Sequence, residues 1–206
     1  MYIPSNYSMQ DHASIIAFMQ QYSFAIIVSS KEEVIQANHL PFVVEETQGR
    51  LTLTSHFAKA NDQWKQIEEK EVMVIFSEPH AYISPKHYNS KLSVPTWNFI
   101  AVHAYGKAKL IHDDDRTFKE LEKMINNYDL DYRKQWDELP SEYKNNMRKG
   151  IVMFEIEVTR LEAKNKQSQN KADDERQRIL TAMENSPVGS ERELAVWMRK
   201  ELKKNK

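Results

Sequence analysis

The sequence contains no cysteine, only four glycines and no apolar run near the roughly 20 residues of a membrane-spanning helix. Without cysteine the chain can form no disulfide, no thiolate metal site and no cysteine nucleophile. The first residues also lack the basic start and apolar core of a signal peptide. We therefore expect a protein of the cytoplasm, with no membrane span.

Several common motifs are missing as well. The chain has neither a GxGxxG nor a Walker A sequence, which argues against the familiar loop types that bind dinucleotides or nucleoside triphosphates. It has no GxSxG elbow, so we assign no catalytic triad and no catalytic residue. None of the seven histidines forms the i, i+4 pair of a zincin, and we expect no metal site.

The composition is that of a folded protein without strong net charge. Of 206 residues, 40% are hydrophobic and 29% are charged, so the chain can bury a sizeable core. A net charge of −1 argues against a protein that coats nucleic acid by charge alone. From residue 160 onward, however, the chain has 12 lysines and arginines and 8 acidic residues. The preceding part has 17 lysines and arginines and 22 acidic residues. The C-terminal part is therefore modestly basic.

Periodicity predicts short strands with helices between and after them. Alternating or continuous apolar runs predict strands over residues 23–30, 34–44, 51–54, 71–77, 80–85, 96–111 and 151–161. Apolar residues at helical spacing predict helices over residues 11–21, 59–70, 118–125, 139–150, 173–185 and 190–203. We expect Pro79 and Pro85 to mark strand boundaries, Gly106 to allow a bend, and Asp113 to Asp115 to precede a helix start.

The order of these elements indicates the fold class. Many short strands, no repeated βαβ rhythm and few glycines favour an antiparallel barrel with attached helices over a doubly wound sheet. We therefore predict a mainly β protein with α-helices, of the α+β class, with peripheral helices and a C-terminal helical pair.

One heptapeptide, residues 55–61, is the most informative local feature. It places the hydroxyl of Ser55, the imidazole of His56 and the ammonium of Lys59 where the predicted strand gives way to the predicted helix. Backbone N–H groups and cations at such a junction favour an anion such as phosphate. An ordinary solvated turn is the alternative interpretation of the same residues.

Three other polar segments are candidates for contact with a ring-shaped ligand. Asn38 and His39 stand just before a proline, although a polar kink in an edge strand is the structural alternative. Trp97 lies between two polar side chains and is an aromatic platform or a core residue. The segment after the last strand carries amide and hydroxyl groups, or is simply a helix-leading loop. These last two segments contribute Thr96, Trp97, Asn98, Ser168, Gln169 and Asn170.

The last two predicted helices pose the question of DNA binding. Arg192, Arg199 and Lys200 supply positive charge, as do the lysines that follow them. Leu194 and Trp197 are too apolar for a fully exposed reading helix. We therefore favour a helical pair that packs on the barrel or on a second subunit, and DNA contact stays open.

Together these motifs resemble the PaiB-type FMN-binding negative transcriptional regulators along nearly the whole chain. The motifs that carry the resemblance are MYIP (1–4), ANHLPF (37–42), SHFAKAN (55–61), HAYISP (80–85), VPTWNF (94–99), VHAYG (102–106) and SQNK (168–171). The resemblance implies an FMN-binding split barrel, a homodimer with flavin sites at the subunit interface, and repression of sporulation and degradative-enzyme (protease) genes.

The resemblance also implies where the cofactor lies. In related split barrels, basic and hydroxyl groups hold the flavin phosphate, and this role carries over to Ser55, His56 and Lys59. The chain departs from the family pattern with polar Asn165 and Gln167, and with Asp62 in place of a proline. The full predicted cofactor-binding set is Asn38, His39, Ser55, His56, Lys59, Thr96, Trp97, Asn98, Ser168, Gln169 and Asn170.

We therefore expect an FMN-binding split-barrel domain over residues 1–171 and a C-terminal helical extension over residues 172–206. The expected partners are a second copy of the chain and a DNA operator. A flavin-dependent oxidoreductase or flavin reductase is the alternative function, because barrels of this type also serve pyridoxamine-phosphate oxidases. A flavin-storage or partner-binding module without either activity is a third alternative.

Overall fold

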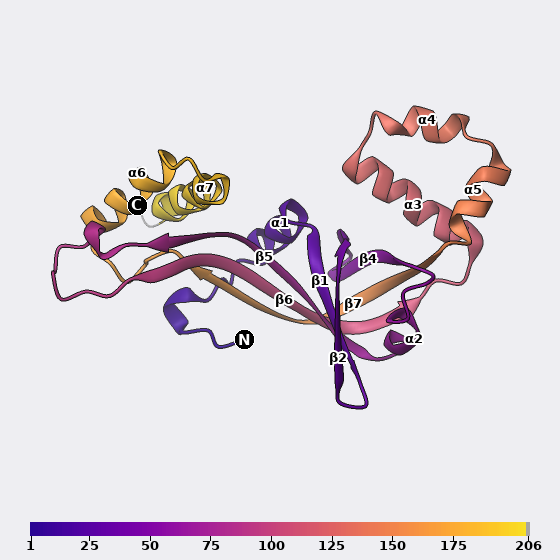
Figure 1. The fold of residues 1–206 in the computed structure, drawn as a ribbon, viewed down its shortest axis with the longest axis horizontal. Coiled ribbons are helices and arrows are strands. Elements are labelled where there is room, and N and C mark those ends of the chain that lie inside the picture. The colour runs from indigo at the N-terminus through magenta and orange to yellow at the C-terminus, as the bar shows by residue number, and fades with distance from the viewer. Residues whose placement is uncertain (205–206) are drawn as a thin grey trace. The chain divides into compact units, whose positions relative to one another are not determined.

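The fold is built on one seven-stranded sheet with the order β2-β1-β5-β6-β7-β4-β3 (Figure 1). A computed structural model describes residues 1–204, with Lys204 described by its backbone only. The strands are β1 (Phe24–Lys31), β2 (Val34–Pro41), β3 (Val43–Thr47), β4 (Arg50–Ala58), β5 (Glu71–Ile83), β6 (Thr96–Leu110) and β7 (Ile151–Lys166). The pairs β1–β2, β1–β5, β3–β4 and β4–β7 are antiparallel.

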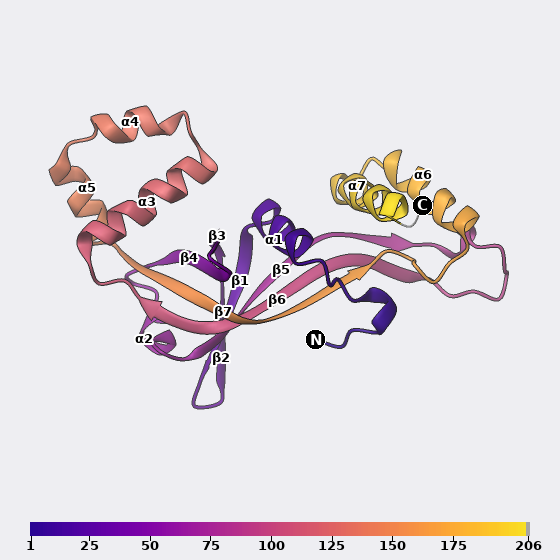
Figure 2. The same ribbon diagram turned by 180° about the vertical axis from the view of Figure 1, so that it is seen from behind.

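The helices stand near the ends of the chain, in one group between β6 and β7, and as one short helix, α2, between β4 and β5 (Figure 2). The α-helices are α1 (His12–Gln21), α2 (Trp64–Ile67), α3 (Asp114–Tyr128), α4 (Tyr132–Glu138), α5 (Ser141–Arg148), α6 (Asp173–Glu184) and α7 (Gly189–Lys204). There are also two short 3-10 helices. The first, η1 (Ser5–Tyr7), precedes α1, and the second, η2 (Pro85–His87), follows β5. No helix in the described residues is long and apolar enough to cross a membrane.

The chain divides into two compact units that each draw on separate stretches of sequence. The terminal unit comprises Met1–Ile15, Ser77–Val102 and the chain from Glu162 onward. The central unit comprises Ile16–Phe76 and His103–Leu161. The strands β5, β6 and β7 therefore begin in one unit and end in the other. The domain boundary predicted after residue 171 stays a prediction.

Aromatic side chains form the centre of the core of the central unit. Phe42, Phe57 and Phe154 are fully buried. The rings of Phe57 and Phe154 stack with their centroids 4.9 Å apart, and Phe42 meets Phe154 edge-on at 6.2 Å. Strand alternation places Phe57 of β4 and Phe154 of β7 inward, and Phe42 lies between β2 and β3.

Helix α3 begins where the acidic run predicted a helix start. The Asp113 carboxylate accepts a hydrogen bond from the Arg116 backbone N–H at 2.7 Å and caps the first turn. Met124 of the same helix is buried in a cluster with Val43, Ile111 and Met153. The cap and the apolar face together explain why this segment is helical.

In the terminal unit, α6 and α7 pack against each other through apolar side chains. Ile179 and Met183 of α6 are buried, as are Leu194 and Met198 of α7. The expected packing of this pair on the barrel or on a second subunit stays a prediction. The N-terminal segment joins the same unit, because the Met9 backbone N–H donates to the Ala163 carbonyl at 3.0 Å.

The predicted helix over residues 59–70 is wrong in its extent. Strand β4 continues to Ala58, since its alternation of inward and outward side chains persists through Phe57 and its pairing with β7 extends to Ile151. Only Trp64–Ile67 is helical. Ser55 and His56 are consequently strand residues, and Lys59 lies in a loop instead of at a helix start.

One further prediction about an element boundary is corrected, and one helix of the structure was not predicted. Pro79 does not end a strand, since β5 runs through it to Ile83. The pairing of β5 with β1 ends at Ile75, so Pro79 lies beyond it. A strand residue that pairs on one side only can be a proline, which has no backbone N–H to donate. The helix α4 has no counterpart in the prediction. Trp136 is the only side chain of this described helix that is buried. The segment therefore has almost no apolar residues at helical spacing from which a helix could be predicted.

Candidate functional site

The loop that carries Lys59 is held by its backbone while its side chain stays exposed. The Lys59 N–H donates to the Gly150 carbonyl at 2.8 Å, and the Lys59 carbonyl accepts from the indole N–H of Trp64 at 3.0 Å. Within the described residues, the Lys59 ammonium forms no ion pair. The backbone of Lys59 is therefore held in place, and its ammonium is available to an anionic ligand.

The acidic residue near Lys59 has its own partner. The carboxylate of Asp62 lies 2.5 Å from the ammonium of Lys65, one helical turn further along the chain. Since this pair cancels the charge of Asp62, the departure from the family pattern at this position does not place an unbalanced negative charge beside Lys59.

Gln63 ties this loop to β1 and β2. Its side chain is 1% exposed and donates from Nε2 to the Ser29 hydroxyl at 2.9 Å and to the Gln36 carbonyl at 3.2 Å. Its Oε1 accepts from Nδ2 of Asn38 at 2.7 Å. Asn38, a predicted cofactor ligand, is thus oriented by Gln63, which sequence reasoning missed because no periodic or motif signal marks it.

Two other predicted ligands of the central unit have defined neighbours. The Ser55 hydroxyl is fully buried and donates to the Pro41 carbonyl at 2.7 Å. This hydrogen bond links β4 to the end of β2. The His39 ring is exposed and stacks on Phe24 with centroids 6.1 Å apart. Their roles toward a cofactor stay predictions.

His56 carries a buried nitrogen without a partner. Its Nδ1 is buried and makes no hydrogen bond among the described residues. Burial lowers the pKa of the His56 imidazole below its ordinary value of 6.5, because the charged form loses solvation. An unpartnered polar atom at this position is a free donor or acceptor for a ligand group.

In the terminal unit, the structure brings together Asn98, near the start of β6, and Ser168, just after the end of β7. Asn98 donates from Nδ2 to the Ser168 hydroxyl at 3.0 Å, and that hydroxyl is placed to donate back to Oδ1 of Asn98 at 3.1 Å. Both side chains are buried. Gln169 closes the same loop, since its Oε1 accepts from the Gln167 N–H at 2.7 Å and its Nε2 donates to the Asn165 carbonyl at 2.5 Å.

The same loop borders a cavity of about 190 Å³. Three predicted residues line it: Thr96, Ser168 and Asn170. Trp97 does not line the cavity, because successive side chains of a strand point to opposite faces and Thr96 lines it. Its ring meets His80 and Tyr82, with centroid distances of 6.0 and 5.9 Å, and is 53% exposed.

The polar residues that depart from the family pattern are buried. Asn165 is 9% exposed and Gln167 is 1% exposed. Neither amide atom of Gln167 has a hydrogen-bond partner among the described side chains and backbone. Leaving such a group unpaired costs about 1–3 kcal/mol, so these amides do not account for the stability of this end of β7.

Comparison with known proteins identifies the family. A family model described as "Putative FMN-binding domain" matches residues 1–160. The chain is also 35% identical over 207 residues to the "Protease synthase and sporulation protein PAI 2" of Bacillus subtilis (strain 168), covering 99% of both chains. The chain belongs to the PaiB-type FMN-binding family. FMN is therefore the cofactor that family membership assigns.

Solved structures confirm the predicted fold class of this PaiB-type protein. The flavocytochrome Anf3 from Azotobacter vinelandii matches with a TM-score of 0.61 and 17% identity, over 78% of this chain and 69% of that one. The FAD and heme binding protein from Mycobacterium smegmatis matches with a TM-score of 0.62 and 11% identity, over 82% and 78%. These likenesses show an α+β fold of the flavin-binding split-barrel type.

No group of three or more histidine, aspartate or glutamate side chains is placed to hold a metal ion in the described part of this PaiB-type chain. His80 instead lies beside Glu78, with its Nδ1 3.4 Å from the carboxylate.

The burial of the His56 imidazole predicts how the free energy of unfolding depends on pH. Because the folded pKa of His56 lies below 6.5, the unfolded chain takes up the proton first as the pH falls. The stability that neutral His56 contributes is complete above pH 6.5 and is lost as the pH falls through the folded pKa. We expect His56→Gln to reduce the slope of unfolding free energy against pH in this window, by at most about 1.4 kcal/mol per pH unit.

Urea unfolding at a series of pH values below 7 measures that slope. His112→Gln is the control, because this histidine is exposed. Equal slopes for His56→Gln and the wild type would contradict the buried, neutral state of His56.

Proposed function

We propose that this protein is an FMN-binding negative transcriptional regulator that represses sporulation and protease genes in the cytoplasm. The observation that carries the proposal is the match to the Bacillus subtilis protein over 99% of both chains, since that relative is named for protease synthesis and sporulation. Full-length similarity at 35% identity supports a shared role more strongly than a shared barrel does.

The residues of the central unit fit the FMN phosphate. Lys59 offers an exposed ammonium without a carboxylate partner in the described structure, and His56 offers an unpartnered nitrogen. We propose that Lys59 holds the phosphate with His56, while Ser55 fixes the strand that carries them. When bound, FMN supplies a ring that accepts and returns electrons.

The amide and aromatic groups complete the proposed cofactor set. Asn38 and His39 of β2 are proposed to contact the flavin ring. Trp97 is proposed as an aromatic platform, and Thr96, Asn98, Ser168, Gln169 and Asn170 as polar contacts or supports. The exposure of Trp97 supports a role in contact with another molecule.

We also propose that the protein is a homodimer. Trp97 and Tyr82 form an exposed aromatic pair on neighbouring strands, and Val94, three residues before Trp97 in the sequence, is 79% exposed. Clustered exposed apolar and aromatic side chains are typical of a surface that another subunit covers.

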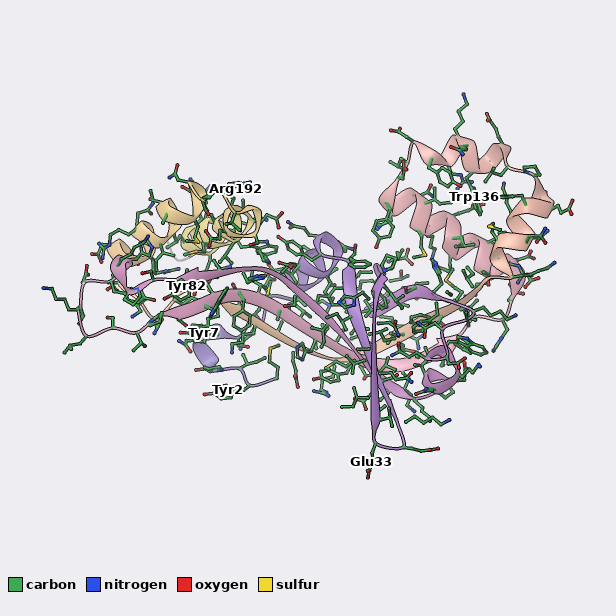
Figure 3. The ribbon with its side chains drawn as sticks, in the orientation of Figure 1. Tyr2, Tyr7, Glu33, Tyr82, Trp136 and Arg192 are labelled. Atoms are coloured by element: carbon green, nitrogen blue, oxygen red, sulfur yellow. The ribbon has the colours of Figure 1, made fainter. Side chains whose placement is uncertain are left out.

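The proposed DNA-binding surface lies on α7, within the C-terminal helical extension of residues 172–206. Arg192, labelled in Figure 3, is exposed on this helix together with Arg199, Lys200 and Lys203. Arg199 pairs with Glu184, and Lys200 lies 4.6 Å from the ring centroid of Trp197. The buried apolar face of α7 holds the helix, so this opposite basic face supports contact with DNA phosphates.

Operator binding tests the proposal. We expect the protein to bind promoter fragments of sporulation and protease genes in the presence of competitor DNA, with affinity that falls steeply with salt. The double variant Lys200→Gln/Lys203→Gln is expected to weaken binding and to lower the slope of log affinity against log salt by roughly 2, one unit for each lost phosphate contact. Fluorescence anisotropy across a salt series measures both quantities.

The matched control is Lys107→Gln/Lys109→Gln, which removes the same charge from exposed positions of β6 in the central unit. Equal binding to arbitrary duplexes, or equal losses in both double variants, would refute a specific operator surface on α7. Turnover of reduced nicotinamide by the FMN-loaded protein, without operator preference, would support the alternative of a flavin-dependent oxidoreductase.

A further inference from the structure

The cavity of the terminal unit has an unusual chemical lining. Its volume is about 190 Å³, and two lysines face it without any aspartate or glutamate among the lining residues. The lining residues are Tyr7, Tyr88, Val94, Pro95, Thr96, Lys166, Ser168, Asn170 and Lys171. A concave site with cations, hydroxyls and an amide, but no carboxylate, favours an anion.

Four separate segments build this cavity. Tyr7 belongs to η1 near the N-terminus and is labelled in Figure 3. Tyr88 follows η2, Thr96 begins β6, and Lys166 ends β7. The pairing of Ser8 with Lys164 holds the N-terminal segment beside the end of β7. The site is therefore anchored by backbone pairing and not only by loops.

The two lysines are held by neutral groups. The Lys166 ammonium donates to the Thr96 hydroxyl and lies 5.9 Å from the ring centroid of Tyr7. The Lys171 ammonium lies 3.8 Å from the ring centroid of Tyr88. Neither lysine has an ion-pair partner in the described residues. Burial and the nearby Lys164 lower the pKa of Lys166, as expected for cations without a counter-ion.

Tyr88 adds an independent sign of a missing ligand. Its side chain is only 9% exposed, and its buried hydroxyl has no hydrogen-bond partner among the described atoms. Burial, followed by the charge of Glu175, raises the pKa of Tyr88. The hydroxyl therefore stays protonated and can donate to an acceptor in the cavity.

The nearby carboxylate of Glu175 does not serve as that acceptor. Its two oxygens accept hydrogen bonds from the backbone N–H groups of Asn89 at 2.6 Å and Ala172 at 3.1 Å. These bonds engage Glu175 at the start of α6. The Tyr88 hydroxyl and the two ammonium groups have no anionic partner in the described structure.

The size of the cavity limits the ligand. Pockets that enclose drug-sized molecules are usually about 300–1,000 Å³, so this cavity is too small for a three-ring flavin. It has room for a phosphate or carboxylate group with a few neighbouring atoms.

We propose that this cavity is an oxyanion site, in which Lys166, Lys171 and the Tyr88 hydroxyl bind a phosphate-sized group. The group is either free phosphate or the phosphate of a larger ligand that reaches in from the opening. The site stands on these contacts alone and does not depend on the proposed role of Lys59.

Calorimetric titration of the full chain with inorganic phosphate at constant ionic strength tests the site. We expect Lys171→Gln to weaken phosphate binding about 10-fold or more, the equivalent of about 1.5 kcal/mol for a charged hydrogen bond. Tyr88→Phe removes only the hydroxyl, and we expect about a 5-fold loss. Since that hydroxyl has no partner in the described chain, this variant should fold as well as the wild type.

The matched controls are Lys164→Gln and Tyr82→Phe. Lys164 lies on β7 next to the site, but its ammonium donates to the Tyr2 carbonyl at 3.2 Å and does not line the cavity. Tyr82 is a half-exposed tyrosine of the same unit. Phosphate binding that is absent from the wild type, or equally weakened in the variants and the controls, would overturn the proposal.

Titrations with FMN and riboflavin distinguish the two sources of the oxyanion. If the group is the phosphate of FMN, Lys171→Gln and Tyr88→Phe will weaken FMN but leave riboflavin binding unchanged. If it is free phosphate, both variants will keep the FMN affinity of the wild type and lose only phosphate binding. Either result supports the site, and Lys59→Ala separately tests the phosphate position in the central unit.

Discussion

Gly106→Ala is expected to destabilise the protein by about 3 kcal/mol, at the upper end of the usual cost of overpacking. A Cβ atom at Gly106 would lie 2.1 Å from the carbonyl oxygen of Glu157 and 2.8 Å from Cγ2 of Ile156. The first of these contacts is with the backbone of β7, which cannot rotate away as a flexible side chain could. The strands must therefore separate locally, with loss of pairing and packing.

Equilibrium unfolding in urea measures this loss, and Gly189→Ala is the control. Gly189 begins α7 and has no heavy atom within 4 Å of the position of an added Cβ. Alanine there is expected to be neutral or to stabilise by up to about 1 kcal/mol. A Gly106→Ala protein as stable as the wild type would show that β6 and β7 do not approach as described.

Lys59→Ala is expected to weaken FMN binding by about 10- to 100-fold, the equivalent of about 1.5–3 kcal/mol for a charged hydrogen bond to phosphate. The loss should be specific to the phosphate, because the Lys59 backbone already holds the loop through Gly150 and Trp64. Riboflavin has no phosphate, so its affinity should be the same for Lys59→Ala and the wild type. Flavin fluorescence quenching measures both ligands.

Lys70→Ala is the matched control, since Lys70 is another exposed lysine of the central unit. It should bind FMN as the wild type does. If Lys59→Ala keeps the wild-type ratio of FMN to riboflavin affinity, Lys59 is not the phosphate ligand.

Regular elements with a clear apolar period could be predicted from the sequence. The helix over residues 11–21 corresponds to α1, and the long run over residues 96–111 corresponds to β6. Helix α3 begins beside the acidic residues, as predicted. In each segment, local propensity and burial favour the same structure, so the short-range pattern is sufficient.

Other elements depend on neighbours that are distant in the sequence. The extension of β4 through Ala58 requires its pairing with β7. The sequence of residues 55–58 contains no local pattern that predicts this pairing. The role of Gly106 is a further example. A bend was expected there, whereas the close approach to Glu157 is what excludes a side chain.

The candidate sites show the same limit. Motif residues such as Thr96 and Ser168 could be selected because they stand in polar segments beside predicted strands. Tyr88 and Lys166 could not, because only the folded chain reveals a buried hydroxyl without a partner and a lysine beside it. Gln63 is similar, since a lone glutamine in a polar loop gives no sign that it links two strands to that loop.

The path of the chain between its two units has a consequence for gene design. The backbone leaves one unit for the other after Ile15, Phe76, Val102 and Leu161. A single stop codon or start codon therefore cannot yield either unit whole and alone. An engineer who wishes to express one of them must splice separate coding segments with new connecting peptides, and a nested deletion series will impair both units before it isolates one.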